Sequence, residues 1–354
     1  MLEIRCTGTP LQIGVKHGSA AQRQILASVD FYANLFQDAC SLTWSEVTRE
    51  AARYVDPLDS LAPRYLEEIR GIAEGAHLPF LDILALNVRT EIMFGLFSEP
   101  ANSIAHAPSD GCTSLAWLTS SASFLGQNWD WMPEQSPNLV VCHVSQPDTT
   151  IPPFSMVTEA GIIGKIGLNA SGVGCCLNAI KYRGVDASRL PIHFALRKVL
   201  EAPTRADAVR TIKTAGVAGS GHILIADPSG STGLECTSQW VKEIEMDEKN
   251  QIFHTNHLIL DDGPPWLADS SARLTRVREL TRRVSDPNLD SIADVLADTE
   301  GYPSSINRKQ QGRSNAETLF TIIMNLTAKS ALVTFGRPTE AREVVPLTFE
   351  HAKQ

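Results

Sequence analysis

The run Ser109-Asp110-Gly111-Cys112-Thr113 places a thiol directly after a glycine, where the character of the chain changes. The preceding residues read mostly as helix, and the following ones read as closely spaced strands. A thiol can attack the carbonyl carbon before it, and glycine leaves that carbonyl open and permits a strained backbone. An N-to-S shift gives a thioester, and water then releases residues 1–111. The junction therefore predicts a chain that cuts itself at Gly111-Cys112 and exposes Cys112 as a new N-terminus.

An N-terminal cysteine carries a nucleophile and a base on one residue. An α-amine titrates at about 7.7–8.0 and a free thiol at about 8.5, so proton transfer between them costs under about 1 kcal/mol. A lysine base, at about 10.4, is mostly protonated at neutral pH. Such a cysteine accepts an acyl group from a thiolester, such as acyl-coenzyme A, becomes a thiolester itself, and passes the group to an amine. Acyl transfer is therefore the chemistry that Cys112 predicts.

Two strand-like segments, 113–118 and 123–130, flank a short polar turn that we centre near Ser121. In that register Cys112 faces Asp130, and directly opposed Cβ atoms lie roughly 4.5–5.5 Å apart. The carboxylate would then lie beside the thiol and, after cleavage, beside the new ammonium group. The alternative is that Asp130 only ends a strand, and the sequence leaves both interpretations open.

The elements around this hairpin predict an α+β layered sandwich rather than a doubly wound sheet, because antiparallel-type strands come in runs and helices in blocks. Ser60 is the expected N-cap of the second helix, and residues 99–110 read as a loop that ends at the junction. The expected helices are 10–37, 59–76, 78–96, 189–201, 204–215, 270–285 and 290–299, and the expected strands are 2–7, 113–118, 123–130, 139–145, 154–159, 162–168, 172–180, 221–226, 232–237, 240–247, 251–258 and two within 317–336.

Composition narrows the class of partner and compartment. A net charge of -9 over 354 residues disfavours nucleic acid, which needs clustered Lys and Arg. The seven cysteines form no C-x-x-C pair, which favours a reducing compartment over a disulfide framework. We find no signal-peptide h-region, no apolar run of about 18 residues and no peroxisomal ending in Ala352-Lys353-Gln354. We expect a cytosolic protein that acts on small molecules without a membrane or nucleic-acid partner.

Several runs, taken together and in order, resemble the acyl-coenzyme A:6-aminopenicillanic acid acyltransferase family, also called the isopenicillin N acyltransferases. The resemblance covers nearly the whole chain, and no single run would be specific alone. The runs are Gly14–Gly18, Glu67–Ala73, Leu86–Glu91, Asp110–Thr113, Gly126–Asp130, Thr158–Lys165, His254–His257 and Gly336–Thr339.

The resemblance implies a four-layer αββα sandwich of the N-terminal-nucleophile hydrolase type. It implies self-cleavage into an α subunit (1–111) and a β subunit (112–354) that stay together as a heterodimer and one folded unit. It also implies acylation of 6-aminopenicillanic acid from acyl-coenzyme A, or exchange of the isopenicillin N side chain, with acyl-coenzyme A as co-substrate and no further cofactor. Matched motif by motif, Cys112 is the nucleophile, Asp130 orients its amine, Asn256 donates to the oxyanion, and Ser220 and Ser314 are serines implicated in processing or activity.

Two departures from the family pattern concern a charged residue and a targeting signal. The family has an arginine directly after the serine matched by Ser314, and this chain has Asn315, which cannot neutralise a carboxylate or an oxyanion. Arg308 or Arg313 is the expected replacement. The missing peroxisomal tripeptide is the second departure. The alternatives are an amide hydrolase of the same mechanism and a weakly active or inactive acyltransferase-like paralogue that retains the fold. The acyl chain that the enzyme would prefer depends on pocket volume, which the sequence does not give.

Other polar residues have simpler interpretations. His254 and His257 are three apart on an expected strand, so their side chains point to opposite faces and we expect no metal site. Ser220 lacks a G-x-S-x-G elbow, which argues against a serine hydrolase. Trp131 is the aromatic residue that we expect near an acyl pocket.

Overall fold

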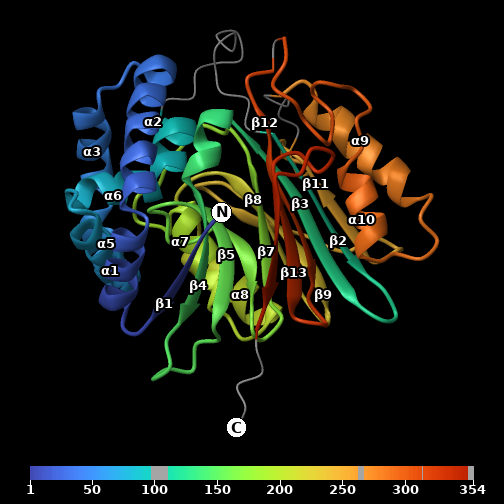
Figure 1. Ribbon diagram of the computed structural model, residues 1–354, viewed down its shortest axis with the longest axis horizontal. Helices are drawn as coiled ribbons and strands as arrows, with labels where there is room; N and C mark the ends of the chain where they lie inside the picture. Colours follow the sequence, from blue (N-terminus) through green and yellow to red (C-terminus); the bar gives the residue numbers. More distant parts are fainter. Residues whose placement is uncertain (97–110, 262–266, 313, 350–354) are drawn as a thin grey trace.

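The computed structural model describes residues 1–96, 111–261, 267–312 and 314–349, and it consists of two stacked β-sheets with helices on their outer sides (Figure 1). From one side to the other the layers are helix, sheet, sheet and helix. This arrangement confirms the four-layer αββα sandwich and the α+β class. The expected loop 99–110 lies outside the described residues.

One sheet has eight strands in the order β1-β4-β5-β6-β7-β8-β9-β10. β1 pairs with β4 in parallel, and every other neighbouring pair is antiparallel. The N-terminal strand is thus joined by main-chain hydrogen bonds to a strand that follows the junction. The bounds are β1 Leu2–Thr7, β4 Leu139–Ser145, β5 Phe154–Glu159, β6 Ile166–Asn169, β7 Gly174–Ala179, β8 Gly221–Asp227, β9 Gly230–Cys236 and β10 Val241–Ile244.

The second sheet has six antiparallel strands in the order β11-β2-β3-β12-β13-β14. The hairpin β2–β3 lies inside this sheet, and nearly all of its residues are buried on both faces. The bounds are β2 Gly111–Leu118, β3 Ser123–Trp131, β11 Gln251–His254, β12 Glu317–Asn325, β13 Ser330–Phe335 and β14 Glu343–Thr348.

The described helices form three groups. α7 and α8 lie against the eight-stranded sheet, α1 to α6 pack together beside its β1 edge, and α9 and α10 cover the six-stranded sheet (Figure 1). None of the helices in the described part of the chain is long and apolar enough to cross a membrane. The bounds are α1 Pro10–Ala20, α2 Gln22–Cys40, α3 Trp44–Ala52, α4 Val55–Leu61, α5 Pro63–Ala76, α6 Phe80–Asn87, a π-helix at Glu91–Leu96, α7 Ile192–Leu200, α8 Arg205–Ala215, a 3-10 helix at Pro133–Asn138, α9 Ser270–Thr281 and α10 Leu289–Leu296.

Glycines allow α1 and α5 to pack in backbone contact. A Cβ added at Gly14 would lie 2.0 Å from the Glu68 carbonyl oxygen, and one at Gly71 would lie 2.4 Å from a carbonyl oxygen of α1. Gly18 and Gly75 make the same kind of contact one turn further on, and the four glycines together form a seam between the two helices. A larger residue at any of these positions would push the helices apart, so the seam fixes the position of the N-terminal helical group.

The helix bounds of the N-terminal part differ from the sequence-based expectation. The expected helix 10–37 is two helices that meet at Ala21, and the expected helix 59–76 is divided before Pro63. Ser60 lies inside α4 and does not cap α5, because Pro63 keeps the residue before it out of the α region and itself takes the first helical position. A helical pattern in hydrophobic residues shows which residues face the core, and it does not register such breaks.

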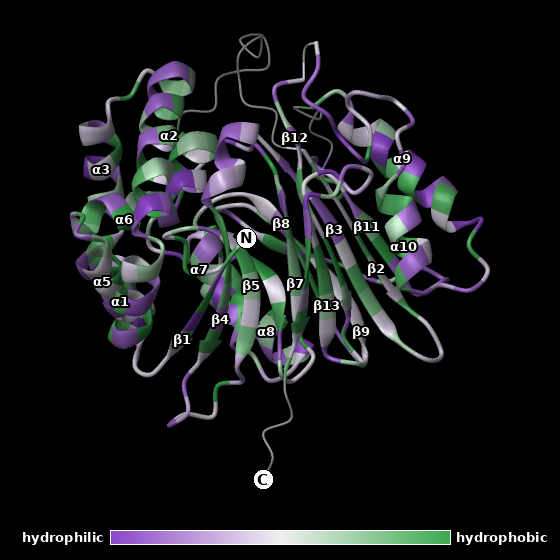
Figure 2. Ribbon diagram, viewed as in Figure 1, coloured by the Kyte–Doolittle hydropathy of each residue, from purple (hydrophilic) through white to green (hydrophobic). Residues whose placement is uncertain are grey.

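The main core lies between the two sheets, and a smaller one lies under α9 and α10. Figure 2 shows hydrophobic residues running along the strands of both sheets. Because β2 and β3 contribute to both cores, their sequences lack a strict hydrophobic–polar alternation. The polar side chains that these strands nevertheless bury are the components of the candidate site.

Candidate active site

The hairpin that carries Cys112 exists, but its register differs from the expectation by one residue. Gly111 pairs with Asp130 and Cys112 pairs with Trp129, because the turn is centred between positions 120 and 121 rather than on Ser121. The predicted pairing of Cys112 with Asp130 is therefore wrong. A slip of one residue moves a side chain to the other face of the sheet.

Neighbouring contacts show where each face points. Gln127, on the face of Cys112, bonds to the Leu177 carbonyl in the other sheet. Asn128, on the face of Asp130, donates to the carbonyl of Leu296 in α10 at 2.7 Å. The Cys112 side chain thus faces the space between the sheets, and the Asp130 carboxylate faces the helices beyond the six-stranded sheet. The carboxylate lies opposite the glycine of the junction rather than beside the thiol.

Cys112 lines a small cavity of about 10 Å³ between the sheets, roughly the room of one water molecule. Trp129 lines it, whereas Trp131, expected near an acyl pocket, is fully buried and is absent from its wall. A larger hollow of about 550 Å³ lies around Phe154 and Phe349, and no predicted site residue lines it. The residues around the small cavity are Arg89, Thr90, Cys112, Trp129, Lys165, Leu177, Ala179 and Ser220.

Two cations in the wall of this cavity are anchored to one buried carboxylate. Arg89 lies 2.6 Å from Glu159, and Lys165 and Tyr32 also bond to Glu159. Burial by itself raises the pKa of Glu159, but Arg89 and Lys165 outweigh it and hold that pKa well below its usual range. The Lys165 ammonium lies 3.6 Å from the centre of the Trp129 ring. The cavity therefore has positive charge in its wall next to the thiol.

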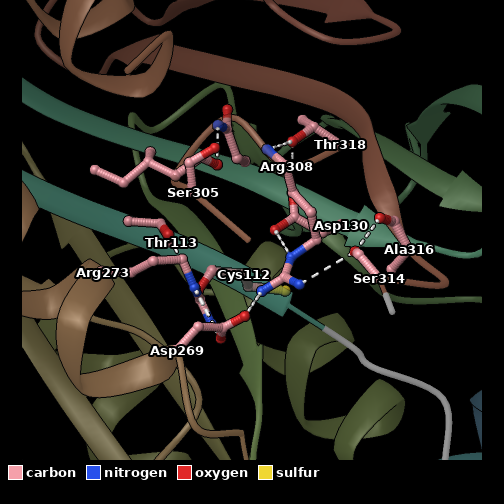
Figure 3. Close-up of polar contacts among 12 residues, drawn as sticks. Cys112, Thr113, Asp130, Asp269, Arg273, Ser305, Arg308, Ser314, Ala316 and Thr318 are labelled. Atoms are coloured by element: carbon pink, nitrogen blue, oxygen red, sulfur yellow. Dashed lines mark hydrogen bonds and ion pairs between the residues drawn. The ribbon is translucent and has the colours of Figure 1, made fainter. Parts of the chain in front are cut away.

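On the other face, two arginines and two aspartates surround the junction (Figure 3). Arg308 Nε lies 3.4 Å from Asp130 Oδ2, and Arg308 Nη2 pairs with Asp269. Thr318 donates to Asp130 Oδ1 at 2.7 Å. Burial lowers the pKa of the Arg308 guanidinium, but Asp269 and Asp130 raise it above its ordinary value. The group is a fixed positive charge beside the junction.

Glycine is required at position 111 because a side chain would not fit there, and not because of the backbone conformation. Its φ is not positive, unlike that of several other glycines in the described chain. A Cβ at this position would lie 2.7 Å from Arg308 Nε and 3.0 Å from Asp130 Oδ2. The expectation that glycine here permits a strained backbone is replaced by a simpler reason, which is that only glycine leaves room for this ion pair.

Asn256 contacts the main chain of Cys112. Its Oδ1 accepts a hydrogen bond from the Cys112 N–H at 2.8 Å and another from Arg273 Nη2 at 2.9 Å. Its Nδ2 donates to the Ala179 carbonyl at 3.0 Å. Two donors at the oxygen and an acceptor at the nitrogen fix the orientation of the amide. The described geometry thus brings Asn256 to Cys112, and its role as a donor to the oxyanion stays a prediction.

The two predicted serines lie at different distances from the thiol. Ser220 lines the cavity, and its hydroxyl donates to the Ile180 carbonyl at 2.6 Å. Ser314 donates to the Ala316 carbonyl at 3.0 Å and accepts from Arg308 Nη1 at 3.5 Å. Asn315 is half-buried next to Ser314, and Arg313 lies outside the described residues.

The sequence-based analysis did not find Arg273, Asp269, Arg89 or the role of Lys165. Asp269 and Arg273 are four residues apart on one helix face, which predicts an ion pair but not its place. Lys165 and Arg89 lie inside runs that resemble the family, so those runs were the available signal. Nothing local to the sequence indicates that these residues meet at Cys112.

Comparisons with known proteins show the family of the chain. Residues 117–340 match the family model described as acyl-coenzyme A:6-aminopenicillanic acid acyl-transferase. Over 99% of its length the chain is 34% identical to the acyl-coenzyme A:6-aminopenicillanic-acid-acyltransferase 40 kDa form of Emericella nidulans, of which it covers 97%. The chain belongs to this family of acyltransferases. The resemblance seen in the sequence runs is thereby confirmed.

Two solved structures are also similar to the chain. One is the Caenorhabditis elegans ortholog of N-acylethanolamine-hydrolyzing acid amidase, with 16% identity, a TM-score of 0.48, and coverage of 61% of this chain and 93% of that one. The other is penicillin V acylase from Agrobacterium tumefaciens, with 14% identity, a TM-score of 0.41, and coverage of 63% and 83%.

Proposed function

We propose that this member of the acyltransferase family cleaves itself at Gly111-Cys112 and then moves an acyl group from acyl-coenzyme A to 6-aminopenicillanic acid, or exchanges the side chain of isopenicillin N, in penicillin biosynthesis. The observation that supports the proposal most is the position of Cys112. It is the second residue of β2, its thiol faces a cavity between the sheets, and its N–H bonds to Asn256. Family membership supplies the reaction class.

In the cleavage step, the Cys112 sulfur attacks the Gly111 carbonyl carbon and the bond from that carbon to the Cys112 nitrogen breaks. The thiol proton goes to that nitrogen, which leaves as the amine. Water then hydrolyses the thioester, so the Gly111 carboxylate and the free thiol form. Asn256 Oδ1, 2.8 Å from the nitrogen, holds it in place throughout. Asp130 pairs with Gly111 across the hairpin, one residue before the amine that this step would release, and is the carboxylate that we assign to orient it.

In the transfer step, the α-amine takes the thiol proton and the thiolate attacks the acyl-coenzyme A carbonyl. Coenzyme A leaves as its thiol with the proton from the amine. The amino group of 6-aminopenicillanic acid then attacks the Cys112 thioester and gives up a proton to the α-amine. The bond from the acyl carbon to the Cys112 sulfur breaks, and the thiolate takes that proton and becomes the thiol again. The amine and the thiol differ in pKa by under about 1 unit, so both proton transfers are nearly balanced.

The oxyanion formed in each attack needs donors. Asn256 Nδ2 uses one hydrogen on Ala179, and its second hydrogen is the one that we assign to the oxyanion. Arg308 takes the place of the cation that the family carries at the position of Asn315, because it lies buried at the junction with a raised pKa. Ser220 and Ser314 fix, respectively, the cavity wall and the Arg308 side chain.

The two fragments would stay associated after cleavage. Arg197 in α7 forms a buried ion pair with Glu68 in α5 at 2.6 Å. Asn87 donates to the Gly161 carbonyl and accepts from the Ile163 N–H. Together with the β1–β4 pairing, these contacts join the segment 1–111 to the segment 112–354 in one folded unit.

The mass of the purified protein tests cleavage directly. We expect two species, 1–111 and 112–354, and a single intact chain in Cys112→Ala. Phenylacetyl-coenzyme A with 6-aminopenicillanic acid, compared with water as the only acceptor, then tests the transfer. An acylated product supports the proposal, while hydrolysis alone would favour an amide hydrolase. An intact chain that turns over acyl donors at full rate would refute the mechanism.

A further inference from the structure

We propose that Arg273 is a positioning residue that holds the Cys112 main chain and the Asn256 side chain together, and whose charge keeps the released α-amino group in its neutral, proton-accepting form. The inference rests on the proposed function, because it concerns the amine that cleavage would create. Arg273 lies on α9 and is far from Cys112 in the sequence. No sequence run that resembles the family contains it.

Arg273 contacts three different acceptors of the site at once, and Figure 3 labels two of the residues concerned, Cys112 and Thr113. Its Nη1 donates to the Cys112 carbonyl at 2.7 Å and to Thr113 Oγ1 at 3.1 Å. Its Nη2 donates to Asn256 Oδ1 at 2.9 Å. A planar guanidinium can hold these acceptors in one geometry, whereas a lysine ammonium cannot reproduce the fork.

Arg273 is itself fixed. Its side chain is 2% exposed, and Asp269, one turn earlier, accepts from Nη2 at 3.1 Å and from Nε at 3.3 Å. The other oxygen of Asp269 pairs with Arg308. The guanidinium thus arrives at Cys112 already oriented, which is what a residue that positions a nucleophile must provide.

The contact to Asn256 decides which way that amide points. With Arg273 in place, the amide oxygen lies between two donors, the guanidinium and the Cys112 nitrogen. Without the guanidinium, the amide loses one of the two contacts that keep its oxygen toward Cys112. A flipped amide would direct an N–H at the Cys112 nitrogen and displace it.

The charge of Arg273 acts on the same nitrogen. The Cys112 nitrogen and Arg273 Nη2 lie 2.8 and 2.9 Å from the same Asn256 oxygen. The two nitrogens are therefore within the roughly 4–6 Å over which a charge shifts a pKa. A neighbouring cation disfavours the ammonium form, so Arg273 lowers the pKa of the amine, while the nearby carboxylates oppose it. The charged groups around this position are Asp130 on β3, Asp269 and Arg273 at α9, Arg308 before β12, and Arg89, Glu159 and Lys165 behind the cavity.

Three variants and one control separate charge from positioning. Arg273→Met removes both, Arg273→Lys keeps the charge and loses the fork, and Asp269→Asn removes the opposing negative charge. Arg276→Met is the control, because Arg276 lies on the same helix and pairs with Asp298 away from the site. Intact mass first establishes that each variant is cleaved, and the pH profile of kcat/KM is then measured on cleaved enzyme.

The acid limb of that profile reports protonation of the amine, since the ammonium form cannot accept the thiol proton. Loss of a cation raises the pKa of the amine, so Arg273→Met moves the limb to higher pH by about 1 unit and lowers kcat/KM at pH 7 by up to about tenfold. Asp269→Asn moves it to lower pH. Arg273→Lys leaves the limb in place but lowers kcat, and Arg276→Met changes neither.

A limb that stays at the wild-type pH in Arg273→Met would overturn the inference. If Arg273→Met does not fold or cleave, Asp269→Asn decides, because a limb that fails to move to lower pH overturns it equally. Failure of the proposed function would look different. The wild-type protein itself would then be active with Cys112 still joined to Gly111.

Discussion

Replacement of Gly111 by alanine should slow self-cleavage sharply. The new Cβ would lie 2.7 Å from Arg308 Nε and 3.0 Å from both Arg308 Nη2 and Asp130 Oδ2. Real Cβ atoms essentially never approach a heavy atom within 3.0 Å, so the guanidinium, the carboxylate or the β2 backbone must move. Arg308 is 1% exposed and Asp130 is fully buried, so neither can swing into solvent.

The size of the effect follows from what such a movement breaks. Arg308 is held by Asp269 and Asp130, and Asp130 is held by Thr318. A hydrogen bond to a charged group contributes about 1.5–3 kcal/mol. A loss of one such contact from the geometry needed for cleavage corresponds to a rate about 10- to 150-fold lower, since every 1.36 kcal/mol is a factor of ten.

The assay is the fraction of intact chain, measured by mass at intervals after synthesis or refolding. Gly126→Ala is the matched control, because Gly126 is on the neighbouring strand and its added Cβ would closely approach only Ile292 and Leu296 side-chain carbons, at 3.2 and 3.3 Å, with the Ile322 carbonyl oxygen in ordinary contact at 3.7 Å. Those side-chain ends can move by a few tenths of an ångström, so this variant should be cleaved at close to the wild-type rate. Cleavage of Gly111→Ala at the wild-type rate, with an unchanged melting temperature, would refute the role of space at the junction.

Two further predictions concern buried charges away from the thiol. Burial raises the pKa of Glu91 to about 7 although its Oε1 accepts from the Ile192 N–H, so the contribution of Glu91 to stability is full below its unfolded pKa and is lost as pH rises through 7. Glu91→Gln should therefore reduce the fall in unfolding free energy between pH 5 and 8 by up to about 3 kcal/mol. Chemical denaturation at each pH that gave an equal fall for both proteins would contradict this. Arg197→Met leaves the Glu68 carboxylate buried without its partner, so it should cost about 3–5 kcal/mol in chemical denaturation, and Arg197→Met with Glu68→Leu should recover much of that loss. A single variant as stable as the wild type would show that the pair does not join the two segments.

The fold could be predicted from the sequence to the level of class and layers. The hairpin strands, the helices α7 and α8, and the blocks of strands were predicted nearly at their observed bounds, because each depends on residues close together in the chain. β14 was missed, and the helices before the junction were joined across Ala21 and Pro63. Hydrophobic spacing does not show such breaks, since it reports the buried face and not the backbone.

The register at the junction shows where local patterns stop being sufficient. The residues 111–118 and 123–131 are buried on both faces, so no polar face distinguishes one pairing from its neighbour. A turn misplaced by half a residue then moved Asp130 from the face of Gly111 to the face of Cys112. The residue that does pair with Cys112 is Trp129, and only the structure shows it.

What the sequence by itself determined is the adjacent Gly111-Cys112 pair, the order of the elements and the family, because these depend on adjacent residues or on runs read in order. What only the tertiary structure decided is the set of side chains that meet at Cys112. Arg273 and Arg308 come from elements more than a hundred residues away, and the cavity exists only because two sheets stack. Such contacts depend on how elements pack against one another, and no periodic pattern in the sequence predicts them.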